Sequence, residues 1–524
     1  MARRDTWFDR ALTAVAPTWA LRRQRARLAG QLLARHYEAA APGRRTSNWY
    51  RVNTDANTAI GASLATLRNV ARDLVRNNPY AESALSTIVD QAVSWGIQPA
   101  TKHDAFMRWA ASTACDADGR HDLAGLQKLV MRTVVESGEC LVRRRWRRLE
   151  DGLPLPLQLQ VLEPDFLDTT RDATALTNGG QIIQGVEFDA LGRRVAYWLY
   201  RQHPGSSISV TSTRFSGQSS RVPAEDVQHI FKQMRPGQVR GPSWFAPVLL
   251  RFKDFDEYED ATLMKQKIAA CLAVLTSDVD GSAPALGTAD DSETTGIDTL
   301  EPGMIMNLPP GRNIEVVQPP NVQDYDDFAR NQLRAIATGL GVTYEDLTGD
   351  YGEMSFSAAR MSRLRHWDRV EDWRWRLLVP QLLNPVWTWA MQAADLLGLP
   401  TAAATEWTAP PLPMIEPDKE GLAIQRNIRT GITTLSEAIR ERGYNRDTFL
   451  AELKKDFDDL DKLGLVLDCD PRKMTQAGQL QATPGAAGSK ERGFVNLIRE
   501  TEPSTAARWL ALMFGQGAAP EPRP

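Results

Sequence analysis

The stretch that decides the fold runs from Gln238 to Cys271 and reads QVRGPSWFAPVLLRFKDFDEYEDATLMKQKIAAC. Pro242 suits the first turn of a helix, where the missing N–H of proline costs little. We therefore expect a long helix from Ser243 to Cys271, about 44 Å in length at 1.5 Å per residue. Its apolar residues recur at spacings of three, four and three, which predicts a seam for a neighbouring helix along Phe245, Val248, Phe252 and Phe255.

The middle of this helix carries a stripe of acidic residues: Asp254, Asp256, Glu257, Glu259 and Asp260. Two interpretations of the stripe are open. It is either the solvated face of an exposed helix, which the residues alone favour, or the wall of a pore. An acidic wall repels phosphates, so nucleic acid would not adhere to it.

The segment before the long helix changes from a helical to a strand pattern. Helical spacing of apolar residues predicts helices from Leu64 to the stop at Asn77-Asn78-Pro79, then over 80–95 and 123–135. Strand-like runs follow at 157–162, 182–188, 194–200 and 227–231, and Asp189-Ala-Leu-Gly192 reads as a hairpin turn. This part of the chain is predicted to be an α+β block.

The segment after the long helix is irregular at first and then mainly helical. Residues 272–322 are rich in Gly, Ser, Asp and Thr, with strand-like runs at 304–308 and 314–317. We expect a helix over about 323–340, a Gly/Asp loop at 348–352, and a very long helix over 355–397 that Pro380 and Pro385 kink or break. One or two charged helices follow over 415–465, a short docking helix over 494–514, and mobile segments at 476–492 and 515–524.

The very long helix is rich in arginine and tryptophan. Its basic residues are Arg360, Arg363, Arg365, His366, Arg369, Arg374 and Arg376, with Asp368, Glu371 and Asp372 between them. Ion pairs within or between helices explain such a pattern, but arginine also suits carboxylate or phosphate partners on another molecule. Five of the fifteen tryptophans lie between Trp367 and Trp389. A buried core is the default interpretation of these tryptophans, but Trp together with Arg is also typical of interface anchors. We favour pairing between subunits, with a DNA contact as the alternative.

The charge of the chain is unevenly distributed. The net charge of the 524 residues is −3, yet residues 1–51 hold eleven arginines against three acidic residues and carry +8, which leaves −11 on the rest. The composition therefore excludes a nucleic-acid binder that works through bulk positive charge, but leaves a basic N-terminal arm. The arm is either a nucleic-acid or scaffold contact or a solvated tail.

The chain shows no sequence signature of catalysis or of a metal site. No phosphate-binding P-loop, nucleophile elbow or zinc-binding helix motif occurs, and the four cysteines are scattered without metal spacing. We therefore nominate no catalytic residue, metal or cofactor. We also expect neither a signal peptide nor a membrane span, and a protein made in the cytosol. Two other classes stay open: a DNA-processing enzyme such as a nuclease with carboxylate-bound Mg²⁺, and a monomeric DNA-binding adaptor.

An ordered series of stretches resembles the lambda-type portal proteins of tailed phages. They include ARDLVRNNPY at 71–80, SGECL at 137–141, LEPD at 162–165, GVEFD at 185–189 and GQVRGP at 237–242. The series continues with LEPG at 300–303, GLGVTYEDL at 339–347, FSAAR at 356–360 and IEPDKE at 415–420. No single stretch is diagnostic, but their order and their spread over about 46–465 make the resemblance specific.

The resemblance implies a portal fold of α+β class, with long stem helices, a strand-containing wing and clip, and a helical crown region, assembled as a ring. Mapped onto this sequence, the parts are a basic arm (1–45), the wing (46–240), the first stem helix (241–271), the clip (272–322), the second stem helix (323–347), the tunnel loop (348–356), a long tunnel or wing helix (357–398), a crown-side helical region (399–470) and a mobile tail (471–524).

The resemblance also implies a function without an enzymatic step. The ring, usually of twelve subunits, would sit at one capsid vertex, with assembly in the host cytoplasm. Double-stranded DNA would pass through it during packaging and ejection, and terminase and then the head–tail connector would dock on it. Major capsid and scaffold proteins are the other expected partners. The stem acids Asp254, Asp256, Glu257, Glu259 and Asp260 would face the channel. The tunnel loop would contain Gly349, Asp350, Tyr351, Gly352, Glu353 and Met354. A subunit interface or DNA contact would use Arg360, Arg363, Arg365 and Arg369.

Overall fold

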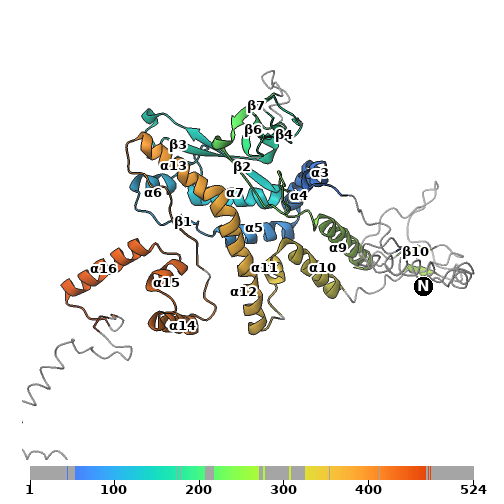
Figure 1. The fold of residues 1–524 in the computed structure, drawn as a ribbon. Helices are drawn as coiled ribbons and strands as arrows, with labels where there is room; N and C mark the ends of the chain where they lie inside the picture. Colours follow the sequence, from blue (N-terminus) through green and yellow to red (C-terminus); the bar gives the residue numbers. More distant parts are fainter. Residues whose placement is uncertain are drawn as a thin grey trace, which may run out of the picture.

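The computed structural model describes Arg44 and residues 53–173, 175–177, 179–206, 218–270, 275–277, 306–308, 325–352, 354–411, 413–467, 470 and 472–473. Within these residues, helices pack against small sheets, in agreement with the predicted α+β class (Figure 1). Several predictions concern residues outside this description: all of the arm except Arg44, the run at 314–317, and the segments at 476–492, 494–514 and 515–524. None of the described helices is both long and apolar enough to cross a bilayer.

Four helices build the first layer, and the predicted ones are confirmed. They are α4 Leu64–Asn77, α5 Pro79–Val93, α7 Leu123–Ser137 and the shorter α6 Asp104–Ala110, after a single turn of helix, α3 Ala56–Gly61. Asn78 separates α4 from α5 because its side-chain oxygen accepts the Ala81 N–H at 3.0 Å. Asp122 begins α7 in the same way, accepting the Gly125 N–H at 2.7 Å. Gly138 ends α7 in the left-handed region, at φ +92°.

Two antiparallel sheets follow α7. In the first, β2 Glu139–Trp146 lies between β3 Leu157–Leu162 and β8 Val227–Phe231. The second contains β4 Gln181–Ile183, β5 Val186–Phe188, β6 Arg194–Tyr200 and β7 Ser219–Pro223, in chain order. A single strand over 182–188 was the wrong prediction, because the chain reverses at Gln184 and Gly185, both at positive φ. Elsewhere, β1 Gln98–Pro99 pairs with β11 Trp407–Thr408.

The long helix predicted from Ser243 begins later, as α9 Leu249–Ala270. Pro247 cannot donate a backbone N–H, so residues 244–248 form turns, with the Val248 N–H donated to the Phe245 carbonyl at 2.8 Å. The predicted seam is confirmed, since Phe245, Val248, Phe252 and Phe255 are all buried. Further on are the parallel pair β9 Leu275–Ser277 and β10 Met306–Leu308, then α10 Tyr325–Leu340 and α11 Tyr344–Thr348. α9 and α10 lie side by side, with Tyr258 packed on Phe328 (Figure 1).

The very long helix neither breaks nor ends at its prolines. It runs as α12 Phe356–Asp372, a π-helical segment Trp373–Leu383 and α13 Asn384–Leu396, in one curved rod across the molecule (Figure 1). Pro380 lies inside the π-helical segment, where the wider turn takes the place of the predicted kink or break.

The charged region after this rod forms three helices rather than the predicted one or two: α14 Pro417–Thr430, α15 Leu435–Glu441 and α16 Arg446–Leu463. The additional boundaries are local signals. Gly431 ends α14 at φ +75°, and Thr434 and Asn445 cap the following two helices with their side-chain oxygens.

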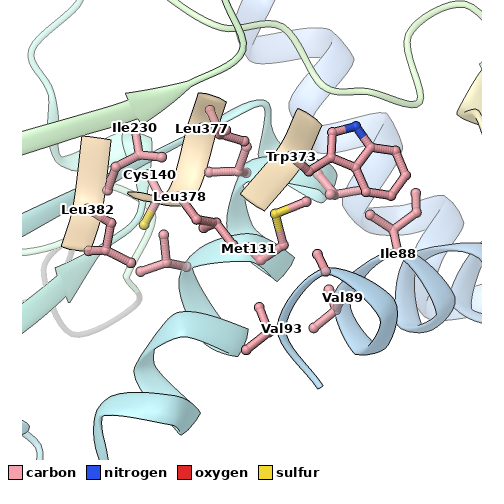
Figure 2. Packing of buried hydrophobic residues seen from close by; sticks show 14 of the residues in the cluster. Ile88, Val89, Val93, Met131, Cys140, Ile230, Trp373, Leu377, Leu378 and Leu382 are labelled. Carbon is pink, nitrogen blue, oxygen red and sulfur yellow. The ribbon is translucent and has the colours of Figure 1, made fainter. Parts of the chain in front are cut away.

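The main core lies where α5, α7, the first sheet and the π-helical segment meet (Figure 2). Val89, Met131, Cys140, Leu378 and Leu382 are among the buried side chains that fill it. Tryptophans of the curved rod belong to this core, so burial explains Trp373, Trp387 and Trp389. A second cluster lies between the two sheets, around Leu141, Val186 and Tyr197. Cys115 and Cys140, the two cysteines that the structure describes, are buried free thiols.

Candidate functional site

The five acids of α9 divide between two faces of the helix. Asp254, Glu257 and Asp260 are exposed, and their spacing of three places them along one side. Asp256 and Glu259 are half-buried on the other side, and Asp260 lies one turn from Asp256, at the border between the two sides. Asp256 accepts a hydrogen bond from the Asn78 side chain at 2.6 Å, and Glu259 accepts one from the Tyr325 hydroxyl at 3.0 Å. Burial raises the pKa of both inward carboxyls, and Asp260 adds to the effect.

The inward acids therefore hold α9 in place, while the outward ones are available to a ligand or a channel. Asp256 connects α9 to the cap of α5, and Glu259 connects it to the first residue of α10. The outward face also carries other side chains: Lys253 pairs loosely with Glu257 at 3.7 Å, and Leu250 is 77% exposed. The exposed surface of α9 is thus acidic in its middle, and toward its ends it also carries basic and apolar side chains.

The loop predicted at 348–356 begins on a fixed turn. Gly349 ends α11 at φ +72°, a conformation that favours glycine. Asp350 then accepts the Gly352 N–H at 3.1 Å and the Tyr344 hydroxyl at 3.2 Å, and the Gly352 N–H holds the pKa of Asp350 below its usual range. Glu353 lies outside the described residues.

The middle of this loop reaches into solvent beside a cavity. The side chain of Tyr351 is 61% exposed. The cavity, of about 440 Å³, lies between α5, α11 and α12, and its lining includes Tyr351, Met354, Trp95 and Arg363. The loop is therefore anchored at its base, and the Tyr351 side chain is exposed.

The arginines of α12 serve different purposes. Arg360 pairs with Glu416 at the start of α14, at 2.9 Å, which fits the interpretation of ion pairs between helices. Among the residues that the structure describes, none forms an ion pair with Arg363, Arg365 or Arg369. The side chains of Arg363 and Arg365 are exposed, so these two remain available to another molecule.

His366, next to Arg365, is a structural residue. It is buried, its Nδ1 lies 3.1 Å from the Gly341 carbonyl oxygen, and its Nε2 contacts the Gln91 side chain. Burial lowers the pKa of His366, which favours the neutral ring.

Sequence reasoning missed a buried network of charged residues. Glu139, at the start of β2, accepts hydrogen bonds from Arg240 Nε at 2.9 Å, Arg68 Nη2 at 3.0 Å and the Gly241 N–H at 3.1 Å. Its other neighbour is His229 Nε2, at 2.9 Å. Burial alone would raise the pKa of Glu139, but Arg240 and His229 outweigh it and hold the pKa well below the usual range. Burial lowers the pKa of His229 to about 4.

This buried network joins α4, β2, β8 and the segment that leads into α9. Glu139 and Arg240 fall within the stretches SGECL and GQVRGP, so the only sequence signal was their membership of the ordered series. Charge alone could not reveal the network, because its partners lie 71 to 101 positions apart in the chain.

A second charged cluster brings Glu163, Asp165 and His203 together. Arg72 Nη2 lies 3.1 Å from Glu163 Oε2 and 2.7 Å from Asp165 Oδ2, so a guanidinium already supplies positive charge there. The arrangement is explained as an ion-pair cluster between α4 and the segment after β3.

The sequence of the chain matches known proteins. The family model described as "Phage portal protein, lambda family" matches residues 42–374. A probable portal protein of Halomonas phage phiHAP-1 is 26% identical over 466 residues, covering 83% of this chain and 88% of the relative. The portal protein of Escherichia phage N15 is 24% identical, over 62% and 68% of the two chains, and portal protein B of Escherichia phage lambda is 22% identical, over 57% and 63%.

Chains from solved structures also match this one. A chain from the neck of an empty gene transfer agent particle is 16% identical, with a TM-score of 0.41 over 73% of this chain and 93% of the other. A chain from a native gene transfer agent virion is 14% identical, with a TM-score of 0.38 over 71% and 90%. The family assignment rests on the sequence match, which covers more than half of the chain: this protein belongs to the lambda family of phage portal proteins.

Proposed function

We propose that this portal protein forms a ring, of twelve subunits by family resemblance, at one vertex of the capsid, and that double-stranded DNA passes through the ring during packaging and ejection. The protein would act without catalysing a reaction, as a conduit and an assembly hub. Terminase and then the head–tail connector would dock on it, and the shell and scaffold proteins would surround it. Assembly would take place in the host cytoplasm, before the ring becomes part of the virion.

The observation that carries the proposal is the outward row of carboxylates Asp254, Glu257 and Asp260 on α9. A cyclic assembly turns each exposed carboxylate into a circle of identical charges. Such circles repel the phosphates of DNA, so a duplex could move past them without being held. The inward acids support this role, because they fix the face that α9 presents.

We assign the parts of the chain accordingly. Residues 46–240 would form the wing, with α9 and α10 as the two stem helices and 272–322 as the clip on which terminase and the connector dock. The loop at 348–356 would narrow the channel, with Asp350 fixing its base and Tyr351 at its free side. Residues 399–470 would form the crown side, and Arg363 and Arg365 would meet a neighbouring subunit or the DNA.

Charge inversion on α9 tests the channel. In a variant with Asp254→Lys, Glu257→Lys and Asp260→Lys, rings should still form, but DNA-filled heads should fall by about tenfold or more, because cationic circles attract phosphates. The matched control inverts three exposed acids elsewhere, Glu441, Glu452 and Asp458, with the same change in net charge. Equal packaging by the two variants would show that the outward face of α9 does not meet the DNA.

A further inference from the structure

The first sheet carries a basic run that the channel does not use. Residues 143–148, at the end of β2 and just after it, read Arg-Arg-Arg-Trp-Arg-Arg. Successive side chains of a strand point to opposite faces of its sheet. The run is therefore divided into two sets: Arg144 and Trp146 on one face, and Arg143, Arg145 and Arg147 on the other.

On one face, the guanidinium of Arg144 has its partners within the protein. Arg144 donates to Asp226 at 2.6 Å and to the side chain of Gln392 on α13 at 2.8 Å. Its guanidinium also lies over the rings of Trp146 and Trp389, at 5.2 and 5.8 Å from their centroids. This arginine ties the sheet to the curved rod, and the nearby acidic residues are engaged by it.

The opposite face has positive charge without matching carboxylates. In the described part of the chain, the side chains of Arg143 and Arg145 form no ion pair or hydrogen bond, and both residues are half-buried. Their partners across the strand pair are the uncharged Gln160 and Gln158. Arg147 donates to Gln158 at 2.6 Å, which places it on the same face. We call Arg143, Arg145, Arg147, Gln158 and Gln160 the basic strip.

The electrostatics of the basic strip are unfavourable without a ligand. Burial lowers the pKa of Arg143, and the neighbouring charge of Arg145 lowers it further. Two guanidiniums held side by side on one face of a strand therefore repel each other, with Asp226 as a partial counter-charge for Arg143. An anion with several negative groups would relieve this repulsion along the strip.

We propose that the basic strip binds the phosphodiester backbone of DNA, at a place separate from the channel surface of α9. Alternate residues of a strand lie about 7 Å apart, which is similar to the separation of successive phosphates along one DNA strand. Guanidinium groups bind phosphate in a bidentate manner, and Arg143 and Arg145 have no carboxylate within ion-pair distance in the described part of the chain. Where α9 repels DNA, the strip holds it. The inference goes beyond the proposed conduit and does not require the channel assignment.

A salt titration of DNA binding tests the strip on the full-length protein. The variant is Arg143→Gln with Arg145→Gln. The control is Arg193→Gln with Arg376→Gln, which removes the same charge from two exposed arginines that pair with Asp189 and Asp372. Affinity for a short fluorescein-labelled duplex would be measured by anisotropy over a range of salt concentrations, with thermal unfolding and ring formation as checks of the fold.

The strip variant should bind the duplex about tenfold more weakly than the control at low salt. The slope of log K against log salt should become shallower by about two, one for each lost phosphate contact. An affinity and slope equal to those of the control would overturn the proposal. It would also be overturned if a polyglutamate peptide bound the wild-type strip and duplex DNA did not, since the strip would then serve an acidic protein surface. Neither result would bear on whether the protein forms a ring.

Discussion

At the scale of single residues, Glu139 shows how a charge can be placed inside this protein. A buried carboxylate is costly unless nearly all of its hydrogen-bonding capacity is used. Here two arginines, a histidine and a backbone N–H supply the partners, and they come from three segments: α4, β8 and the segment that leads into α9. The network therefore makes the position of the segment leading into α9 depend on α4 and on the first sheet.

Removal of the charge of Glu139 should strongly destabilise the folded protein. Glu139→Gln keeps the shape of the side chain but leaves the buried Arg240 guanidinium without its carboxylate, and leaves Arg68 with Asp165 as its carboxylate partner. We expect a loss of about 3–5 kcal/mol in unfolding free energy, measured by denaturant titration. The control Glu150→Gln changes an exposed residue and should cost less than about 0.5 kcal/mol. Equal effects of the two substitutions would show that the network contributes nothing to stability.

The same network predicts how stability depends on pH. Burial lowers the pKa of His229 to about 4, from an ordinary value near 6.5. Between these values the unfolded chain binds more protons than the folded one, so stability should fall as the pH drops from about 6.5 to about 4. The loss from this histidine should approach about 3 kcal/mol. Melting curves of His229→Gln should show a shallower slope over this window, and an unchanged slope would contradict the assignment.

At the scale of elements, one close approach controls how α7 meets the segment that leads into α9. Gly138 ends α7 at φ +92°, and a Cβ at this position would lie 2.3 Å from the Pro242 carbonyl carbon and 2.4 Å from the Gly241 carbonyl oxygen. Only a glycine lets the end of α7 contact the backbone that continues into α9.

Gly138→Ala should therefore destabilise the protein by more than about 3 kcal/mol, because backbone strain adds to a clash that no side-chain rotation can relieve. Gly152→Ala is the matched control: Gly152 has φ +68°, but its added Cβ would have no neighbour within 4 Å. The control should cost about 1 kcal/mol. Thermal unfolding of the two variants measures the difference, which is the contribution of the close contact.

The elements also show what can be predicted from sequence. The spacing of apolar residues located α4, α5, α7 and α10, because each has one face on the core. The start of α9, the reversal at Gln184 and the π-helical segment around Pro380 were not predicted, since each depends on a local backbone choice that periodicity does not record.

The candidate site could also be predicted only in part. The acidic stripe was found, but which of its members face inward depends on Asn78 and Tyr325, whose positions come from the fold.

At the scale of the whole molecule, the distribution of charge matters more than its sum. The net charge of −3 combines an arm of +8 with a remainder of −11. Within the remainder, acidic α9 and the basic strip lie on different elements, so repulsion and attraction of DNA are assigned to different surfaces. A conduit that must both release and organise DNA needs such a separation.

The arm should contribute to incorporation rather than to the ring. Deletion of residues 2–45 removes most of the positive charge of the arm, and Arg44 is the one described residue that it removes. We expect the deleted protein to form rings normally and to enter capsids several-fold less often, because scaffold, capsid or DNA contacts of the arm are lost. The measurement is the portal content of purified capsids, and normal incorporation would contradict this role.

The central claim, that this chain forms a DNA channel, is tested most directly by electron microscopy of the purified full-length protein. The account predicts closed rings with a central hole. In a reconstruction, α9 should line that hole, with Asp254, Glu257 and Asp260 facing the opening. Compact monomers without a hole, or rings in which α9 faces away from the opening, would contradict it.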